Sequence, residues 1–485
     1  MLDFVARGSS IQPTHSIVRP GQFPVAAANI PGMLIRRSAR RFSVINRLPY
    51  HVLACLLLGV LLAGCATPPR TLMPTPLVYQ EPDGPALFTR TVAARQRPAV
   101  DLLYVTDRAP ETDPESDLPY GQERARRIVF GSAEVEMLPS LDWASLEAES
   151  RLAERDEEIV LSLGEVTELG AFPQEPFRLR TNPAGEVFRT DAVLAEYEAA
   201  KQQFQAEIRR RLENAPTREA ILYVHGFNET FASAAYTAAD LCHYLGREHL
   251  CMFFTWPASS SGNFLISYTS TTESAEFAVD HLKKTIRLVA SMPELEGVQL
   301  LAHSRGTAVL LSALRELLIE TIAAGKEPVE ALEIDNVVLF SPDIDLDIAG
   351  QQVTAYISDP DLISVWPEQR LPRGIRGRLT VYASPEDRAL RVSSLLFRSR
   401  SRLGGLAGLP PEAQAYLARI GRLDMVVYEG DRTDAFGHSY FTTNPRVSSD
   451  VIQMLRYGKR LGEPGRELVQ TGPVVWEFPR PGDGG

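Results

Sequence analysis

The chain has 485 residues, of which 44% are apolar and 23% charged, a composition typical of a folded protein. Its formal charge of −11 is unevenly distributed. Residues 1–64 hold seven arginines against one acid, a surplus of six positive charges, which leaves −17 for residues 65–485. Nucleic-acid binding needs a basic surface, so this acidic body argues against a nucleic-acid partner. None of the four cysteines has the spacing of zinc ligands, and we expect neither a metal nor a cofactor.

The N-terminal segment is typical of a targeting sequence. Basic residues from Arg36 to Arg47 precede an apolar run over 52–62, which is too short to span a bilayer but fits the h-region of a secretory signal. The run closes on Leu-Ala-Gly-Cys at 62–65, which resembles the lipobox of bacterial lipoproteins. The resemblance implies cleavage before Cys65 and lipidation of its thiol, and a short membrane anchor or an ordinary signal peptide is the alternative.

Two further features of this segment bear on its start and its destination. Most such signals place the basic flank near the first residue, so Met33 is predicted as the true start. Ala66, where some lipoproteins have aspartate, implies an outer-membrane lipoprotein that faces the periplasm. That compartment is oxidising. We therefore expect a cell-envelope protein held at the membrane by its N-terminal lipid.

The chain is predicted to divide into five segments. Residues 1–64 form the extension and signal peptide, and the proline- and threonine-rich residues 65–98 carry the lipidated cysteine and a tether. The remaining segments are a β-rich extension over 99–188, a main domain over 189–462 and a C-terminal tail over 463–485. In the β-rich extension, strands are predicted at 100–106, 127–137 and 158–163.

The main domain alternates strands with helices. A charged amphipathic helix is predicted over 191–212, where apolar residues recur at helical spacing. Strands follow at 220–224, 250–254, 298–304, 336–340, 378–382 and 424–428, and helices at 231–245, 273–290, 308–323 and 448–461. This alternation predicts an α/β fold with a doubly wound, mostly parallel sheet. Its active groups should lie on the loops beyond the carboxyl ends of the strands.

A nucleophile is predicted where one of these strands meets its helix. The apolar run from Val298 ends in Ala302-His303-Ser304-Arg305-Gly306, and helical sequence resumes at once. This layout is typical of a nucleophile elbow, a tight turn that presents a serine hydroxyl at the edge of a sheet. The usual pattern is G-x-S-x-G, and alanine is the least costly replacement for its first glycine. Ser304 is the predicted nucleophile.

Chain order identifies the base. In enzymes with such an elbow, the acid and then the histidine follow the serine along the chain. Six histidines lie beyond Cys65, and only His438 is downstream of Ser304. It lies in a loop between the last predicted strand and the last helix. His438 is therefore the predicted general base, and a role for His225 or His303 as hydrogen-bonding scaffold is preferred to direct catalysis.

Two strand ends between Ser304 and His438 offer a carboxylate. Asp387 follows the strand at 378–382, and Asp343 follows the strand at 336–340. The acid must reach Nδ1 of the histidine to orient its ring. Asp387 occupies the commoner position in the serine–acid–histidine order and is preferred, while Asp343 stays open as the alternative acid.

Acyl transfer also needs donors for the oxyanion. The backbone N–H of Arg305, the residue after the nucleophile, supplies one donor. The turn His225-Gly226-Phe227-Asn228 at the end of the strand 220–224 supplies the second, with the N–H of Phe227 preferred. Gly226 permits the unusual backbone that this turn requires.

Several blocks of the chain together resemble a bacterial α/β-hydrolase family of formerly unknown function, related to esterases and lipases. The blocks are Tyr223 to Asn228, Phe254 to Pro257, Leu301 to Gly306, Ser384 to Leu390 and Gly437 to Phe441, and the stretch Tyr104 to Arg108 resembles the family's opening block. The resemblance implies the α/β-hydrolase fold and a serine hydrolase centre at Ser304, Asp387 and His438. Arg305 departs from the family pattern, which often has methionine there.

The expected function is hydrolysis of carboxylic esters through an acyl-enzyme, with a small-molecule or lipid ester as substrate. An amidase or transacylase acting on envelope substrates is one alternative, and a catalytically silent envelope binding protein is the other. Cys242 and Cys251 fit either a disulfide or two buried free thiols, because the compartment is oxidising but cysteines are often buried unpaired.

Overall fold

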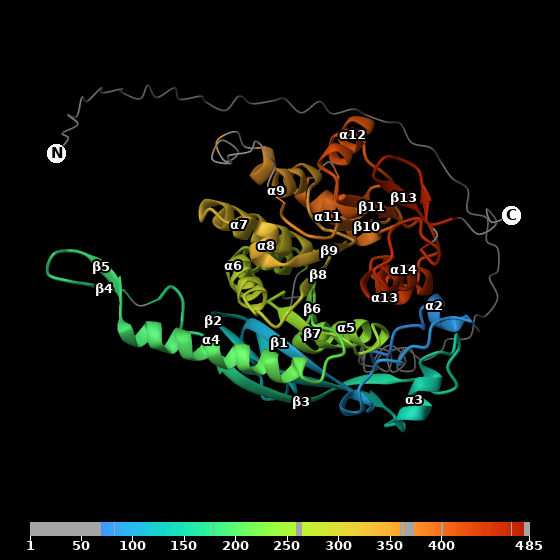
Figure 1. The fold of residues 1–485 in the computed structure, drawn as a ribbon, viewed down its shortest axis with the longest axis horizontal. Coiled ribbons are helices and arrows are strands. Elements are labelled where there is room, and N and C mark those ends of the chain that lie inside the picture. Colours follow the sequence, from blue (N-terminus) through green and yellow to red (C-terminus); the bar gives the residue numbers. More distant parts are fainter. Residues whose placement is uncertain are drawn as a thin grey trace, which may run out of the picture. The chain divides into compact units, whose positions relative to one another are not determined.

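The computed structural model describes residues 69–81, 83–177, 179–258, 264–358, 361, 373–398, 401–466 and 468–479. These residues belong to one compact unit, Pro68–Gly485. Its centre is an 11-stranded sheet in the order β12-β13-β11-β10-β9-β8-β6-β7-β1-β2-β3 (Figure 1). The predicted signal peptide and Cys65, the predicted site of lipidation, lie outside the described residues.

The elements have the following bounds. The strands are β1 Ala99–Pro110, β2 Tyr120–Leu138, β3 Val160–Ala171, β4 Leu179–Thr181, β5 Val187–Arg189, β6 Glu219–Val224, β7 Leu250–Thr255, β8 Gly297–His303, β9 Ile334–Phe340, β10 Leu379–Ala383, β11 Leu423–Val427, β12 Val469–Gln470 and β13 Val475–Glu477. The helices are α2 Leu77–Gln80, α3 Trp143–Glu149, α4 Asp191–Leu212, α5 Phe231–Tyr244, α6 Phe264–Ala290, α7 Gly306–Ala323, α8 Pro328–Leu332, α9 Leu346–Ser358, α11 Arg388–Phe397, α12 Pro411–Ile420, α13 Tyr440–Thr443 and α14 Pro445–Leu455.

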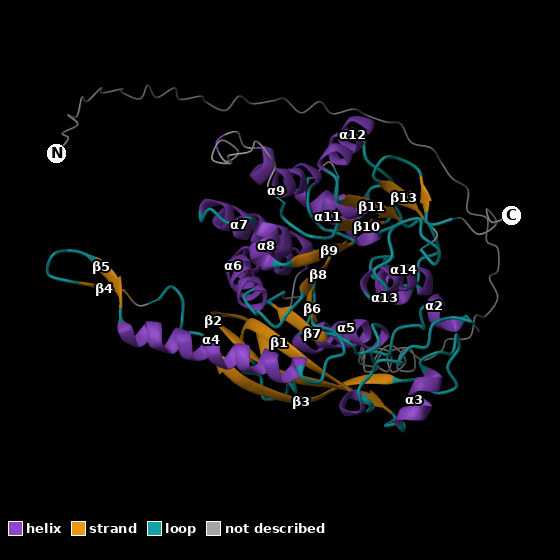
Figure 2. Cartoon of the chain, viewed as in Figure 1, coloured by secondary structure: helices purple, strands orange, loops and turns teal. Residues whose placement is uncertain are grey.

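The middle of the sheet is parallel and buried on both faces. Strands β13 to β1 in the sheet order all pair in parallel with their neighbours. Along β6, Ile221 and Tyr223 pack into one apolar core, which α5 and α14 cover, whereas Leu222 and Val224 pack into the other, which α4, α6 and α7 cover (Figure 2). Because side chains alternate between the faces of a strand, a strand with helices on both sides must be apolar throughout. The predicted doubly wound α/β fold is thus confirmed.

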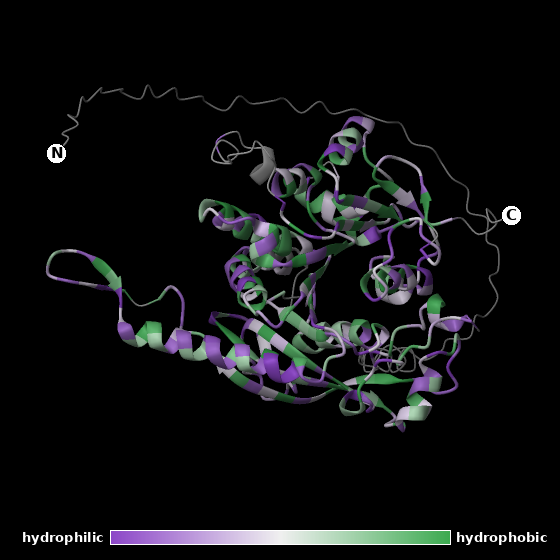
Figure 3. Cartoon of the chain, viewed as in Figure 1, coloured by the Kyte–Doolittle hydropathy of each residue, from purple (hydrophilic) through white to green (hydrophobic). Residues whose placement is uncertain are grey.

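The predicted β-rich extension is continuous with this sheet. Strand β1 pairs in parallel with β7, and β2 and β3 then add to it in antiparallel fashion. Helix α4 crosses this edge and alternates hydrophobic with hydrophilic residues along its length (Figure 3). Its Phe204 packs against Phe130 of β2, with ring centroids 5.1 Å apart. Strands from 99–188 and helices from 189–462 therefore share one core.

The segments predicted as tether and tail also contact the main body. Leu72, Tyr79 and Phe88 are buried, and Arg70 pairs with the buried Asp240 of α5 at 2.9 Å. At the other end of the chain, β13 pairs in parallel with β11 and so extends the sheet. Apolar side chains scattered among prolines or glycines give little periodicity, which is why the sequence did not predict these contacts.

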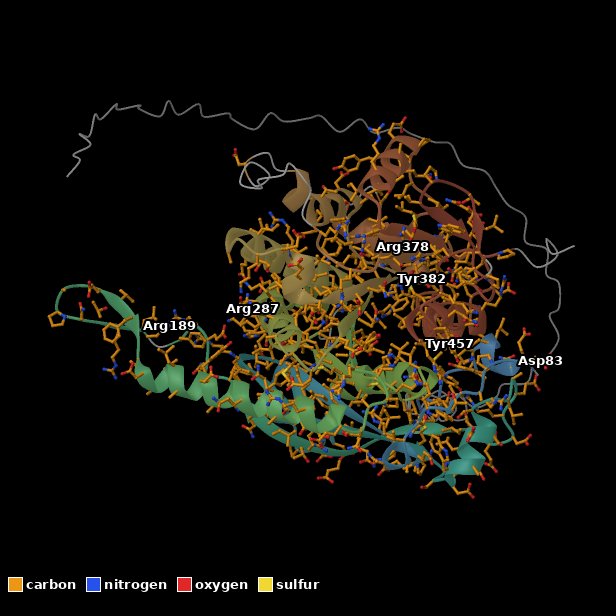
Figure 4. The ribbon with its side chains drawn as sticks, viewed as in Figure 1. Asp83, Arg189, Arg287, Arg378, Tyr382 and Tyr457 are labelled. Carbon is orange, nitrogen blue, oxygen red and sulfur yellow. A yellow bond between two sulfur atoms is a disulfide. The ribbon has the colours of Figure 1, made fainter. Side chains whose placement is uncertain are left out.

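Three local features differ from the predicted elements. Helix α6 begins at Phe264 rather than at 273, because the serines and threonines over 267–272 interrupt its apolar pattern. Helix α14 ends at Leu455 rather than at 461, since Gly458 turns the chain with a φ of 63°. Finally, β4 and β5 form a separate antiparallel hairpin beyond α4, and Figure 4 shows Arg189 on it, away from the body of the molecule.

Candidate active site

Ser304 lies in the tight turn between β8 and α7. Its φ is 52°, in the left-handed region that a residue with a side chain seldom adopts. Hydrogen bonds from three residues hold the turn. Ser304 N donates to Phe340 O of β9 at 2.9 Å, Asp343 N donates to Ser304 O at 3.1 Å, and Thr307 donates to the same carbonyl through Oγ1 at 2.6 Å and through N at 3.2 Å. Strained backbone held by its surroundings is typical of functional sites. The turn has the conformation that the elbow sequence predicts.

Two glycines allow the neighbouring strand to approach this turn. A Cβ on Gly226 would lie 2.6 Å from Cβ and 3.3 Å from Oγ of Ser304. A Cβ on Gly306 would overlap the carbonyl oxygen of His225. Contacts this close leave no space for a side chain, so both positions need glycine. The turn after β6 therefore lies directly beside the Ser304 hydroxyl.

His438 and Asp387 meet at the same edge of the sheet. Asp387 follows β10, His438 follows β11, and Nδ1 of His438 lies 2.6 Å from Oδ2 of Asp387. Asp387 is 1% exposed, and its Oδ1 accepts from Leu390 N, which caps α11. Because a carboxylate accepts, His438 Nδ1 is the protonated nitrogen and Nε2 carries the lone pair. That is the tautomer that a general base requires.

The loop that carries His438 is fixed by a second carboxylate. Asp434 accepts hydrogen bonds from the backbone N–H groups of Phe436, Gly437, His438 and Ser439. The carbonyl of His438 in turn accepts from His303 Nε2 at 3.1 Å and from Ser341 Oγ at 2.9 Å. The backbone around His438 is therefore held from both sides, which restricts where its ring can lie.

The electrostatics of the His438 site favour the charged imidazolium. Burial lowers the pKa of His438, but the charge of Asp387 and its hydrogen bond outweigh burial, and Asp343 and Asp434 add to their effect. The net result is a pKa above the ordinary 6.5. A histidine that accepts a proton from serine is stabilised by such an environment.

Asp343, the alternative acid, has other partners. Its Oδ1 accepts from Ser393 Oγ at 2.6 Å and lies 3.4 Å from Nε of Arg402. Its backbone N–H bonds to Ser304, so it lies near the nucleophile through its main chain. Asp387 is the carboxylate that contacts the ring of His438, at 2.6 Å.

The predicted oxyanion turn has an unusual backbone, and the buried ring of His225 packs against Trp256 beside it. Asn228 adopts a φ of 61°. The ring of His225 stacks on Trp256 with centroids 5.4 Å apart, and its Nε2 accepts from Trp256 N at 3.0 Å. Burial, reinforced by the charge of Arg108, holds the pKa of His225 well below 6.5. A neutral, fully buried His225 is the scaffold residue that the sequence predicts.

Arg108 is a site residue whose role the sequence did not predict. It is fully buried and donates to Gly121 O, Thr255 Oγ1 and Glu229 O. It thereby links β1 to the start of β2, to the end of β7 and to the residue that follows the predicted oxyanion turn. The signal that could have pointed to this role is an arginine just beyond the predicted strand 100–106, because arginine is seldom buried without partners.

The structure contains a disulfide between Cys242 and Cys251. Cys242, near the end of α5, is joined to Cys251 of β7, nine residues along the chain. The bond lies at the amino edge of the sheet, opposite Ser304. No helix among the described residues is long and apolar enough to cross a membrane.

This architecture and its elbow define an α/β hydrolase. The chain belongs to the family described as alpha/beta hydrolase of unknown function, DUF900, whose profile matches residues 200–456, more than half of the chain. Arg108 and strands β1 to β3 lie outside the matched range. No curated protein matches the chain.

Similar solved structures include an esterase, a lipase-esterase related protein and a protein named Est1E. An esterase of Pyrococcus furiosus is 14% identical, with a TM-score of 0.27, over 50% of this chain and 83% of its own. A lipase-esterase related protein of Clostridium acetobutylicum is 11% identical, with a TM-score of 0.27, over 49% of this chain and 94% of its own. Est1E of Butyrivibrio proteoclasticus is 12% identical, with a TM-score of 0.23, over 51% and 92%. Likeness at this level carries no argument about activity.

Proposed function

We propose that this protein is a serine hydrolase that cleaves carboxylic esters, with Ser304 as nucleophile, His438 as general base and Asp387 as the acid that orients it. The observation that supports this most is the 2.6 Å contact between His438 Nδ1 and Asp387 Oδ2. The contact lies at the carboxyl edge of the sheet, where Ser304 is held at a φ of 52°. These are the residue types, chain order and placement that acyl transfer requires.

The reaction follows from these roles. Ser304 Oγ attacks the ester carbonyl while Nε2 of His438 takes the hydroxyl proton, and Asp387 stabilises the imidazolium through Nδ1. The tetrahedral oxyanion accepts hydrogen bonds from the backbone N–H groups of Phe227 and Arg305. The alcohol leaves with the proton from His438, and an acyl-enzyme is formed. Water then attacks the acyl group, gives a proton to His438 and releases the acid with regeneration of the Ser304 hydroxyl.

A substrate comparison tests this reaction. Purified protein should hydrolyse 4-nitrophenyl butyrate at a rate proportional to enzyme concentration and should act far more slowly on the matched 4-nitroanilide. Ser304→Ala should remove the activity while the melting temperature stays unchanged. Preferential cleavage of the anilide would favour the amidase alternative. Native protein that cleaves neither substrate would contradict the proposal.

We further propose that the enzyme acts in the cell envelope, anchored by a lipid on Cys65. The sequence Leu-Ala-Gly-Cys at 62–65 supports cleavage and lipidation there. The disulfide between Cys242 and Cys251 fits an oxidising compartment. Cells given a labelled fatty acid should incorporate it into the native protein but not into Cys65→Ala. Equal incorporation into both would contradict lipidation at this cysteine.

A further inference from the structure

Two arginine side chains lie beside the nucleophilic turn. Arg305 follows Ser304 directly, and its Cζ lies 5.5 Å from the ring centroid of Phe397. Arg402 comes from the segment after α11, and its Cζ lies 4.5 Å from the centroid of the same ring. Both guanidinium groups therefore contact one aromatic side chain, although 97 positions separate them in the sequence.

The backbone connects this pair to Ser304. Arg305 Nη1 donates to the carbonyl oxygen of Asp343 at 3.4 Å, and Asp343 N donates to Ser304 O at 3.1 Å. The Arg402 Nε lies 3.4 Å from Oδ1 of Asp343. Arg305 is thus the chain neighbour of the nucleophile, and Arg402 is linked to the nucleophile through Asp343.

The two arginines differ in their ion pairing. Asp343 is the carboxylate in contact with Arg402, and it also accepts from Ser393 Oγ. Among the ion pairs of the described residues, none includes Arg305. The ion pairs of the described residues thus join Arg402 to Asp343, and Asp345, whose backbone is bridged to that of Arg402, lies beside the pair.

Several donors of the pair have no hydrogen-bond partner. Nε of Arg305 and both Nε and Nη2 of Arg402 are buried without an acceptor among the described residues. Arg402 as a whole is 5% exposed. Buried charged donors are strongly disfavoured unless something accepts their hydrogen bonds. If Arg402 served only to pair with Asp343, that ion pair would explain why its Nε is buried. It would not explain the burial of Nη2 of Arg402 or of Nε of Arg305, which have no acceptor among the described residues.

We propose that Arg305 and Arg402 bind an anionic group of the substrate, so that the enzyme prefers esters that carry a carboxylate or a phosphate. This inference rests on the proposed esterase function and adds the substrate class to it. Guanidinium groups match both anions through paired N–H donors, and Phe397 keeps the two side chains in place. Arg305, which stands where the family often has methionine, then contributes to the preference for anionic esters.

The selectivity test compares two esters of similar length. One is neutral 4-nitrophenyl butyrate, and the other is mono-4-nitrophenyl glutarate, which carries a free carboxylate. The quantity measured is the ratio of kcat/KM for the anionic ester to that for the neutral one, because this ratio is insensitive to a general loss of activity. We expect Arg402→Met to lower the ratio about 10- to 100-fold, as loss of a charge-assisted hydrogen bond implies, and Arg402→Lys to restore part of it.

Two further variants check the electrostatic origin of the ratio. Asp343→Asn removes the facing carboxylate and should raise the ratio. Arg315→Met is the matched control, because Arg315 lies on the same helix about 15 Å from Arg305 at 1.5 Å per residue, and its ratio should equal that of the native protein. A ratio for Arg402→Met within twofold of the native value, together with no rise in Asp343→Asn, would overturn the inference.

A binding measurement separates this inference from the proposed function. Ser304→Ala should bind glutarate or methyl phosphate in calorimetry, and Ser304→Ala/Arg402→Met should bind each at least tenfold more weakly. The stronger of the two ligands identifies carboxylate or phosphate as the group that is recognised. Ester hydrolysis without anion binding overturns this inference alone, and anion binding without hydrolysis overturns the proposed function alone.

Discussion

Oδ2 of Asp387 lies 2.6 Å from Nδ1 of His438, although 51 positions separate the two residues in the sequence. Asp343 is buried close by but pairs with Ser393 and Arg402. Asp387→Asn should therefore lower kcat for a neutral ester about 10⁴-fold, because the amide favours the wrong imidazole tautomer. Asp343→Asn should change it by less than about tenfold, which corresponds to about one unit of pKa, since the charge of Asp343 affects His438 less than Asp387 does. Equal losses in the two variants would contradict the assignment of the acid.

The pH dependence should show the raised pKa of His438. The base acts only when neutral, so kcat/KM should rise as pH rises through this pKa. Burial lowers the pKa, but the charge of Asp387 and its hydrogen bond outweigh burial and raise it above 6.5. The midpoint of the acidic limb should therefore lie above 6.5 in a profile of kcat/KM against pH. A midpoint at or below 6.5 would show that the effect of burial on the pKa of His438 is at least as large as the effect of the carboxylates.

Gly226→Ala should damage the site more than it damages the fold. The added Cβ would lie 2.6 Å from Cβ of Ser304 and would push apart the oxyanion turn and the nucleophile. We expect kcat to fall about 10²- to 10³-fold, as for loss of one oxyanion donor. Gly350→Ala in α9 is the control, because no atom lies within 4 Å of its added Cβ. That change should leave kcat unaltered and should stabilise the fold by about 0.5–1 kcal/mol.

Arg108→Lys should slow the reaction by displacing the oxyanion turn. Lysine keeps the charge but cannot donate to Gly121 O, Thr255 Oγ1 and Glu229 O together. We expect kcat for a neutral ester to fall about tenfold or more with little change in KM, because the turn acts mainly on the transition state. A purely structural role would instead lower the melting temperature and leave kcat of the folded fraction unchanged.

The sequence singled out candidate site residues, but it did not single out the residues that hold them in place. His438 was identifiable because it is the only histidine downstream of Ser304, and Asp387 because it follows a strand between them. Arg108 and Asp434 could not be assigned in this way, since their partners come from folding: Arg108 reaches Glu229, 121 positions away, and Asp434 binds backbone N–H groups. Backbone acceptors and donors leave no trace in the residue pattern.

Strands were predicted where the sequence has a continuous apolar run and were missed elsewhere. The buried parallel strands are continuous apolar runs, so β6 to β11 were found within a few residues of their bounds. The exposed hairpin of β4 and β5 has no such run, and β12 and β13 are only two and three residues long. Their pairing depends on turn geometry and on the adjacent sheet edge, which single-sequence patterns do not reveal.

The most direct test of the account is covalent labelling of the native protein by a fluorophosphonate, followed by peptide mapping in a mass spectrometer. The account predicts one labelled residue, Ser304, with no labelling in Ser304→Ala and labelling at least about 10³-fold slower in His438→Ala, because the serine then lacks its base. Native protein that fails to react, or Ser304→Ala that labels as fast as the native protein, would contradict the central claim that Ser304 is an activated nucleophile.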